Sequence, residues 1–480
     1  MNGEPSAVPG PGRHEAHAEF HDLLRAYAAD QARREEAPEE RGVALRRVLV
    51  WYLHSADAAQ TWINPQEAHI PLDPPGDGLT PASFADYDEA MRWYETERGN
   101  LLAATRAAEE AGLDVIAWQL PAVLRSVHML LNPFEEWLAM GRIGLRAARR
   151  LGDRTAEAEL LESLGMACTQ SHRLAEGAEY HQGALAARRE TGDRLGEALS
   201  LNDIGLIHLR GRGLESAKDR FEQAAALFRE LGATHWEAVV TANLAEVTYE
   251  LARPEEASGF VLRALEMHRA LGNEGGEGNA LRILSAIQRD RGRPEEALRS
   301  ARGALDIALT HRNHMWEGYW LLELGRAQQA NGAFDAALVS FQRAASLQRR
   351  LGDRAREARA WDGAGETYRR LGRPGEAADF YRRAAAAHGE LDDLWHTALS
   401  LDGLAGALRE ADEADGGDRG DRGDGSDGAD GSDAAEDARG HWAAALRALT
   451  SYDDPRAVAL RERVSAALAQ EGHPYGNGRT

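Results

Sequence analysis

The chain has 480 residues and a formal net charge of −22, which makes direct binding of nucleic acid by the chain as a whole unfavourable. Hydrophobic residues make up 43% of the sequence, enough to build a long continuous core. A single cysteine, Cys168, excludes an intramolecular disulfide framework and a zinc site built from several thiolates. No apolar run reaches the ~18–20 residues of a membrane helix, and the first residues lack the basic and apolar regions of a signal peptide. We therefore expect a cytoplasmic protein with no membrane partner.

The N-terminal part of the chain divides into a leader and a helical region. Residues 1–13 are rich in Pro and Gly, and we expect them to form a disordered leader. Residues 14–113 carry apolar residues at helical spacing, which predicts helices over Glu39–Ile63 and Ser83–Gly112 among others. Between these two helices, the prolines of residues 64–81 predict an extended strap, because proline disrupts a helix and restricts the residue before it.

From residue 114 to residue 411 one pattern recurs about every forty residues, more weakly in its first copy, Asp114–Asp153. Each copy has two segments of helical periodicity with a turn between them, and ends in a breaker such as LGD or LGN. A fixed period of roughly 20 to 50 residues with one helix–turn–helix per period is typical of an α-solenoid. Small residues also recur at fixed places in both helices, where they let paired helices approach closely. The recurring small residues are Gly165, Gly205, Ala245, Ser285, Gly325, Gly365 and Ala405 in the first helices, and Ala184, Ala224, Ala264, Ala304, Ala344 and Ala384 in the second. The predicted fold class is all-α, a solenoid of antiparallel helix pairs.

This spacing resembles the tetratricopeptide repeat (TPR), lengthened to about forty residues by longer helices. The copy Arg356–Asp393 is the most similar to the consensus. Its matching residues are Gly365, Tyr368, Gly372, Ala377, Tyr381 and Ala384. The resemblance implies a right-handed TPR superhelix whose first helices line a concave face. Such faces usually hold extended peptides through Asn amides and charged side chains.

Positions of the first helices that match this concave face carry amide and guanidinium side chains. We predict them as a partner-binding groove: Asn202, Arg210, Asn243, Arg282, Arg289, Arg326 and Arg369. The last four of these come from successive first helices and predict a basic stripe, which would attract an acidic segment of a partner. The alternative is that neighbouring glutamates, Glu246 and Glu366 among them, neutralise the arginines in local pairs worth little each.

The C-terminal part of the chain interrupts the last repeat. Residues 412–440 are rich in Gly and Asp and lack the ligand spacing of an EF-hand, so we predict a disordered acidic insertion, with weak cation binding as the lesser alternative. Residues 441–470 supply the second helix of that repeat and a helix over Pro455–Gln470 that would cap the open end of the solenoid. We expect residues 471–480 to form a disordered tail.

Segments near the N-terminus add a second resemblance. They are HDLLRAYA at residues 21–28, the helix ending in WYLH, the PLDPP strap and WYETERGNLLAAT. Together they resemble the junction between the NB-ARC ATPase module and the C-terminal TPR sensor array of actinobacterial regulators of the Streptomyces antibiotic regulatory protein type. By that resemblance, His21 and Asp22 match the His-Asp pair that senses nucleotide at the end of the ATPase module. The ATPase and DNA-binding parts of that family have no counterpart here, so we expect a free-standing sensor array without their activities.

Catalytic chemistry finds little support in the sequence. The single lysine, Lys218, does not lie in a P-loop, and neither G-x-S-x-G nor HExxH occurs. Cys168 falls at a packing position in the middle of a helix, which favours a small buried side chain over a nucleophile. His14, His17 and His21 could share one helix face and bind a metal, although a solvated helix edge is the interpretation we favour. We therefore predict no catalytic residue, no metal and no cofactor.

The predicted function is a non-enzymatic TPR scaffold that binds a protein or peptide in its concave groove, in the regulation of transcription or secondary metabolism. Two alternatives remain open. The first is a sensor whose array closes on a small effector or peptide, and the second is an enzyme that uses Glu and His side chains of the groove. Clustered buried carboxylates with shifted pKa values in a deep pocket would favour the enzyme, and an open charged groove would favour the scaffold.

Overall fold

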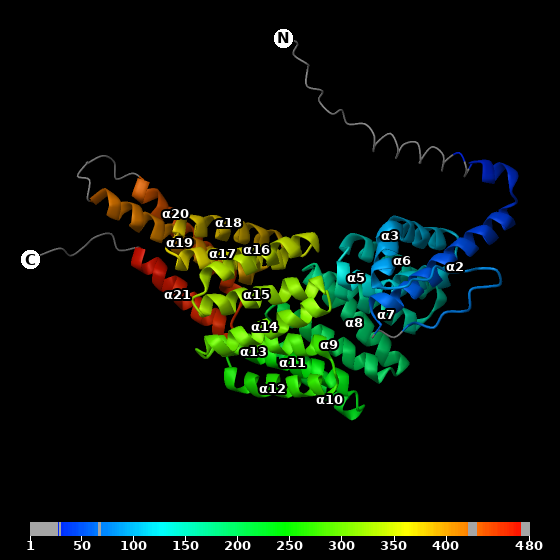
Figure 1. Cartoon of the computed structure of the whole chain (residues 1–480), viewed down its shortest axis with the longest axis horizontal. Coiled ribbons are helices and arrows are strands. Elements are labelled where there is room, and N and C mark those ends of the chain that lie inside the picture. Colours follow the sequence, from blue (N-terminus) through cyan, green and yellow to red (C-terminus); the bar gives the residue numbers. More distant parts are fainter. Residues whose placement is uncertain (1–26, 28–29, 66–68, 421–429, 472–480) are drawn as a thin grey trace, which may run out of the picture. The chain divides into compact units, whose positions relative to one another are not determined.

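The computed structural model describes residues 27, 30–65, 69–420 and 430–471 (Figure 1). The leader expected at residues 1–13 lies outside these residues, as does the tail from residue 472 onward. Regular secondary structure in the described residues is helical throughout. The chain forms two compact units, Met1–Leu124 and Arg125–Thr480.

The first unit contains three described helices joined by a long irregular strap. They are α2 (Pro38–Ile63), α3 (Tyr87–Glu110) and α4 (Asp114–Val123). The strap is held along α2 by side chains of that helix, since Arg47 Nη2 donates a hydrogen bond to the carbonyl of Gly78 at 2.6 Å and Trp51 Nε1 donates one to Thr80 at 3.0 Å. Helix α4 packs against both α2 and α3. The weak first copy of the repeat is therefore divided after Leu124, and its first half belongs to this unit.

The second unit is a series of antiparallel helix pairs, in which each helix packs on the next one along the chain (Figure 1). Its helices are α5 (Arg125–Leu131), α6 (Phe134–Leu151), α7 (Arg154–Gln170), α8 (Leu174–Thr191), α9 (Arg194–Arg210), α10 (Leu214–Glu230), α11 (Thr234–Glu250), α12 (Pro254–Ala270), α13 (Glu274–Asp290), α14 (Pro294–Thr310), α15 (His314–Ala330), α16 (Phe334–Arg350), α17 (Arg354–Arg370), α18 (Pro374–Glu390), α19 (Leu394–Gly420), α20 (Asp430–Ala448) and α21 (Pro455–Glu471). The predicted α-solenoid is confirmed.

Turn chemistry explains why the helices begin and end where they do. The first helix of most pairs starts after an Asp or Asn whose side chain accepts a hydrogen bond from the N–H three residues later, as Asp193 does from Gly196 at 2.8 Å. The second helix of several pairs ends at a glycine with positive φ, such as Gly192 at 74°. An arginine in the last turn before the glycine also pairs with a glutamate eight residues later, as Arg189 does with Glu197 at 2.8 Å. These caps fix the joint between successive pairs.

Complementary side chains fill the middle of each helix pair. Where the first helix carries glycine, a ring from the second helix lies over it, and a Cβ on that glycine would come within 2.6 to 3.1 Å of the ring. The pairs are Gly165–His181, Gly205–Phe221, Gly325–Phe341 and Gly365–Tyr381. Where the first helix carries Ala245 or Ser285 instead, the residue at the facing position is Val261 or Ala301. The recurring glycines therefore make room for a ring.

The C-terminal elements extend the array beyond the expected break. Helix α19 continues to Gly420 and α20 begins at Asp430, so both run into the segment expected to be a disordered insertion; residues 421–429 lie outside the described residues. In α20, Trp442 is buried in a cluster with Leu460 and Val464 of α21. Helix α21 therefore packs where a capping helix is expected.

Candidate functional site

Arginines from several first helices face one another on the inner side of the array, which we call the inner face. Arg210 ends α9, Arg326 lies on α15, and Arg356 and Arg359 lie on α17. Burial, followed by the positive charge of Arg356, lowers the pKa of Arg210 to about 10. Burial, followed by the charge of Arg359, lowers the pKa of Arg326 to about 10. Mutual repulsion of this kind requires the guanidinium groups to lie close together in poorly hydrated surroundings.

An aromatic ring and a carboxylate stabilise one part of the inner face. The guanidinium carbons of Arg282 and Arg356 lie 4.8 and 4.6 Å from the ring centroid of Tyr319 on α15, within the range of cation–π attraction. Arg282 Nη2 also donates to Glu246 Oε2 at 2.7 Å. Burial opposes the charged form of Arg282, but the Glu246 carboxylate outweighs it and raises the pKa of Arg282 above its ordinary value. This arginine is neutralised within the chain.

Two further arginines of the predicted basic stripe also have acidic partners. Arg369 binds Glu410 with two of its nitrogens, Nε at 2.9 Å and Nη2 at 2.6 Å. Arg289 lies 3.9 Å from a carboxylate oxygen of Glu323. With Arg282, three of the four stripe arginines form the local pairs that were the alternative expectation.

The remaining inner-face arginines have no acidic partner. Among the described residues, no hydrogen bond or ion pair joins Arg326 or Arg359 to a carboxylate, and the buried Nε of Arg359 has no acceptor. Arg210 donates to the carbonyl of Thr169 at 2.5 Å, which satisfies a proton without neutralising the charge. The structure thus places Arg210 beside Arg356 and Arg326 beside Arg359, and within the described residues Arg210, Arg326 and Arg359 form no ion pair with a carboxylate. The sequence analysis missed Arg359, which lies three residues after Arg356, on the same helical face of α17.

The two predicted asparagines bind each other. Asn243 on α11 donates through Nδ2 to Oδ1 of Asn202 on α9 at 2.8 Å, and both side chains are buried. This hydrogen bond joins two successive first helices. It leaves the amides less open to a peptide backbone than a row of free asparagines would be.

A second charged cluster lies where α7, α8 and α9 meet. The Arg188 guanidinium is buried and pairs with Glu162. Burial, followed by the Glu162 charge, raises the pKa of Asp203 to about 7. Shifted carboxylates would favour an enzyme, but structural networks of ion pairs shift pKa values as well, and Glu162 pairs with both Arg188 and Arg125. A hollow of about 440 Å³ lies elsewhere, lined by residues that include Arg269 and Ser300.

Two turns near the start of the array contact its C-terminal end. His172 and Arg212 adopt left-handed φ angles of 64° and 62° at turn positions where the next pair has Ala252 and the three after it have glycine. Arg212 binds both carboxylate oxygens of Asp454, at 2.9 and 2.6 Å, and its guanidinium carbon lies 3.5 Å from the ring centroid of Trp395. His172 Nε2 lies 3.3 Å from Oδ2 of Asp393. These contacts close the array, because they join its early turns to its C-terminal end. In the sequence, the contacts are marked by His172 and Arg212 at turn positions that favour glycine.

Comparison with known proteins agrees with this architecture. A family model of the tetratricopeptide repeat matches residues 154–230 and 318–388. The chain carries an array of tetratricopeptide repeats. The resemblance expected from the spacing of small residues is thus confirmed.

Two regulators are similar to part of the TPR chain. Regulatory protein AfsR of Streptomyces coelicolor is 28% identical over 230 residues, covering 38% of this chain and 22% of the regulator. Regulatory protein AfsR of Streptomyces griseus is 30% identical over 174 residues, covering 36% of this chain and 17% of the regulator. The chain spans about a fifth of the length of these relatives. The predicted resemblance to the TPR array of such regulators is confirmed for that part.

Among solved structures, the Rap conjugation gene regulator of the plasmid pLS20, in complex with the Phr* peptide, is similar to the TPR chain with a TM-score of 0.50. The two are 16% identical, and the match covers 58% of this chain and 76% of the regulator. Likeness at this identity concerns the fold alone. Within the described residues, none of the helices has the length and apolar character needed to cross a membrane.

Proposed function

We propose that the TPR array is a non-enzymatic regulatory scaffold that binds a protein or peptide through its inner face, and that the bound segment carries an acidic group. One observation carries the proposal: on the inner face Arg210 lies beside Arg356 and Arg326 beside Arg359, and Arg210, Arg326 and Arg359 form no ion pair with a carboxylate among the described residues. Asn202, Asn243, Arg282, Arg289 and Arg369 would form the surroundings of that contact. We place this role in the cytoplasm, in the regulation of transcription or secondary metabolism.

The charge balance of the inner face explains why an acidic group is expected there. With pKa values lowered only to about 10, Arg210 and Arg326 stay protonated at neutral pH. A carboxylate placed between the guanidinium groups would gain charge-assisted hydrogen bonds and relieve their mutual repulsion. A concave basic surface on an acidic protein also focuses the electric field and speeds the approach of an anionic ligand.

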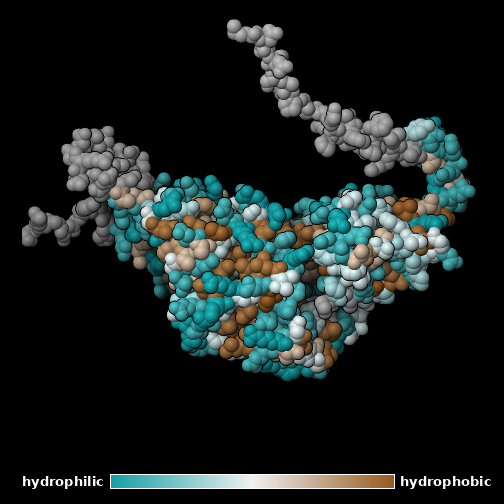
Figure 2. Space-filling view, in the orientation of Figure 1, coloured by the Kyte–Doolittle hydropathy of each residue, from teal (hydrophilic) through white to brown (hydrophobic). Residues whose placement is uncertain are grey.

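The comparisons support a peptide or protein as the ligand. The similar part of the AfsR chains belongs to regulatory proteins, and the pLS20 regulator of similar fold was solved with a peptide bound. Hydrophilic side chains cover most of the face seen in Figure 2, with hydrophobic ones interspersed. Recognition by charge and hydrogen bonds fits such a surface better than the burial of a large apolar patch.

Selection of peptides from a displayed random library against the full chain tests this function. We expect selected peptides to carry Asp, Glu or a free C-terminal carboxylate, and to bind less tightly as salt increases. The double variant R326E/R359E should lose these peptides by more than tenfold in affinity. The matched control R373E/R382E changes the charge equally, at side chains just before α18 and on α18 that are 53% and 57% exposed, and should bind as wild type. Peptides that bind both double variants equally would contradict the inner face as the site.

A second candidate function is a sensor that changes shape when it binds a small effector. The closure between Arg212 and Asp454 favours it, because a ligand that separates these groups would open the array. Small-angle X-ray scattering of wild type and the D454N variant distinguishes the two. If the array is a sensor, the D454N substitution and the binding of a selected peptide should each increase the radius of gyration. If it is a rigid scaffold, the radius of gyration should stay the same when the peptide binds.

A further inference from the structure

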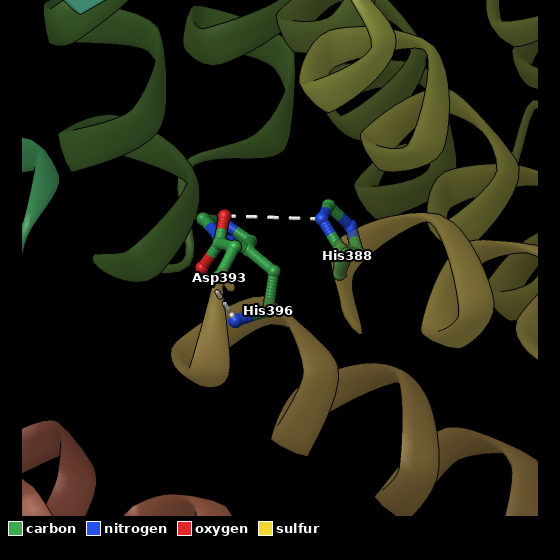
Figure 3. A group of neighbouring side chains, drawn as sticks. All are labelled: His388, Asp393 and His396. Atoms are coloured by element: carbon green, nitrogen blue, oxygen red, sulfur yellow. Dashed lines mark hydrogen bonds and ion pairs between the residues drawn. The ribbon is translucent and has the colours of Figure 1, made fainter. Parts of the chain in front are cut away.

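Three side chains around the α18–α19 turn form a compact group, which we call the histidine cluster (Figure 3). His388 comes from the last turn of α18, Asp393 from the turn itself and His396 from the first turn of α19. Oδ2 of Asp393 lies 2.7 Å from His396 Nδ1 and 3.8 Å from His388 Nδ1. The ligand atoms of the three residues all lie within 4.8 Å of one another.

The hydrogen bonds of His388 determine where its protons are. Its Nε2 lies 3.1 Å from a carboxylate oxygen of Asp362, whose other oxygen accepts a hydrogen bond from Ser400 Oγ at 2.6 Å. A carboxylate only accepts, so Nε2 is the donor and the neutral ring carries a lone pair on Nδ1. That nitrogen is buried, has no hydrogen-bond partner and faces the Asp393 carboxylate. Two lone pairs that face each other in a buried site repel, and a cation between them would remove that repulsion.

At the equivalent positions of other helix pairs, a donor or a positive charge from the chain itself prevents such a repulsion between lone pairs. In the α12–α13 turn, His268 Nδ1 contacts the amide nitrogen of Asn273 at 3.1 Å, so an amide donor takes the place of a carboxylate. In the α16–α17 turn, Arg356 supplies a positive charge to Asp353. The histidine cluster has imidazole rings at both places beside its Asp. The Arg359 charge acts on His396 and opposes a cation, whereas Asp362 and Asp393 supply two negative charges in its favour.

The donor set and the spacing match a divalent transition metal. Tetrahedral zinc with ligands at about 2.0–2.1 Å places its ligand atoms ~3.3 Å apart, and accepts both imidazole nitrogen and carboxylate oxygen. The contacts of His396 and His388 with Asp393 Oδ2, at 2.7 and 3.8 Å, bracket this spacing. A histidine that binds a metal also commonly donates its other ring nitrogen to a carboxylate, as His388 does to Asp362.

We propose that His388, Asp393 and His396 bind a zinc-type divalent cation, and that His172 of the α7–α8 turn positions the shared Asp393 carboxylate. His172 Nε2 lies 3.3 Å from the shared Asp393 oxygen and reaches it from a left-handed turn position, at φ 64°. Through the contact of Asp393 with His172, the metal would also fix the late turn against an early one. It would therefore stabilise the closed form of the array in addition to binding locally.

Competition between the full-length, untagged, metal-free chain and a chromophoric zinc chelator tests the site. We expect wild type to bind one zinc ion per chain at this site. In H388Q and in H396R, the zinc affinity of the site should fall more than tenfold. The H396R variant places arginine where Arg356 stands beside Asp353 in the preceding pair, so the fold should accept it. H268Q, at the equivalent histidine in the α12–α13 pair, is the matched control and should bind zinc as wild type.

The readouts separate this site from other sources of zinc binding. His14, His17 and His21 also have metal-binding spacing, so zinc that persists equally in wild type, H388Q and H396R would overturn the proposal. A wild-type chain that binds no zinc would overturn it as well. Zinc should raise the melting temperature of wild type and leave that of H396R unchanged. In H172G, whose glycine suits the left-handed turn, zinc affinity should fall, and an unchanged affinity would overturn the link to the α7–α8 turn.

Discussion

Replacement of Arg212 by alanine should lower the free energy of unfolding of the array by about 3 kcal/mol, since it leaves the buried Asp454 carboxylate without its counter-ion. Both side chains are only 6% exposed, so solvent screens their ion pair little. Removal of one partner of a buried pair typically costs ~3–5 kcal/mol, and the lost contact with the Trp395 ring adds to this. The loss of unfolding free energy should lie near the lower end of this range, because Asp454 still accepts a hydrogen bond from the Ala457 N–H at 3.2 Å. The left-handed backbone costs the same in both proteins, since alanine and arginine each carry a Cβ.

Urea unfolding followed by circular dichroism measures this loss, with R354A as the matched control. Arg354 and Glu390 join the two helices of one pair, α17 and α18, at 2.6 Å, but are 58% and 59% exposed, so the control should lose less than ~1 kcal/mol. In a double-mutant cycle, R212A and D454A should be coupled by more than ~1 kcal/mol. If R212A and R354A unfold at the same urea concentration, the array does not close through this pair.

Three further predictions concern packing and protonation, and urea unfolding measures each of them. Gly325→Ala should lower the free energy of unfolding by ~1–3 kcal/mol, because its methyl group would meet Phe341 at 2.6 Å. Gly375→Ala, where a Cβ meets nothing within 4 Å, should raise it by up to ~1 kcal/mol. Equal effects of the two substitutions would contradict the ring packing. Ala344→Leu should also cost ~1–3 kcal/mol, because Ala344 is fully buried between helices, and an unchanged stability would mean that its surroundings tolerate a larger side chain. Burial lowers the pKa of His181 to about 4, so between this value and the ordinary histidine pKa only the unfolded chain takes up the proton. Between pH 7 and pH 5, the free energy of unfolding of wild type should therefore fall by ~1–2 kcal/mol more than that of H181F. Parallel pH profiles of the two proteins would contradict a buried neutral ring.

The fold was predictable from the sequence because its determinants are local and repeat. Small residues at a fixed period report the contacts within a helix pair, and breakers such as LGD report the joints between pairs. The predicted α2 and α21 agree with the structure to within one residue at each end. The insertion at residues 412–440 differs, because its composition favours disorder while helices α19 and α20 continue into it from packed neighbours.

The candidate site was predictable only in part, because it depends on how the array curves. The sequence places Arg210 and Arg326 on inward positions, but not beside Arg356 and Arg359, since the approach of α9 to α17 is set by the accumulated rotation of the pairs between them. The ion pairs of these arginines were equally hard to predict, because Arg369 pairs with Glu410 on the first helix of the next pair rather than with a residue of its own helix. The histidine cluster depends on a contact between His172 and Asp393, which lie on different turns far apart in the sequence.

Closure of the array has a consequence for its length. An open solenoid tolerates the gain or loss of a whole unit, because each unit contacts only its neighbours. Here the contacts of Arg212 with Asp454 and of His172 with Asp393 depend on how many helix pairs lie between the joined turns. An added or deleted pair would rotate the C-terminal end away from these turns and leave a buried carboxylate opposite the wrong side chain. Duplication of a unit should therefore destabilise this array, whereas an open solenoid would accept it.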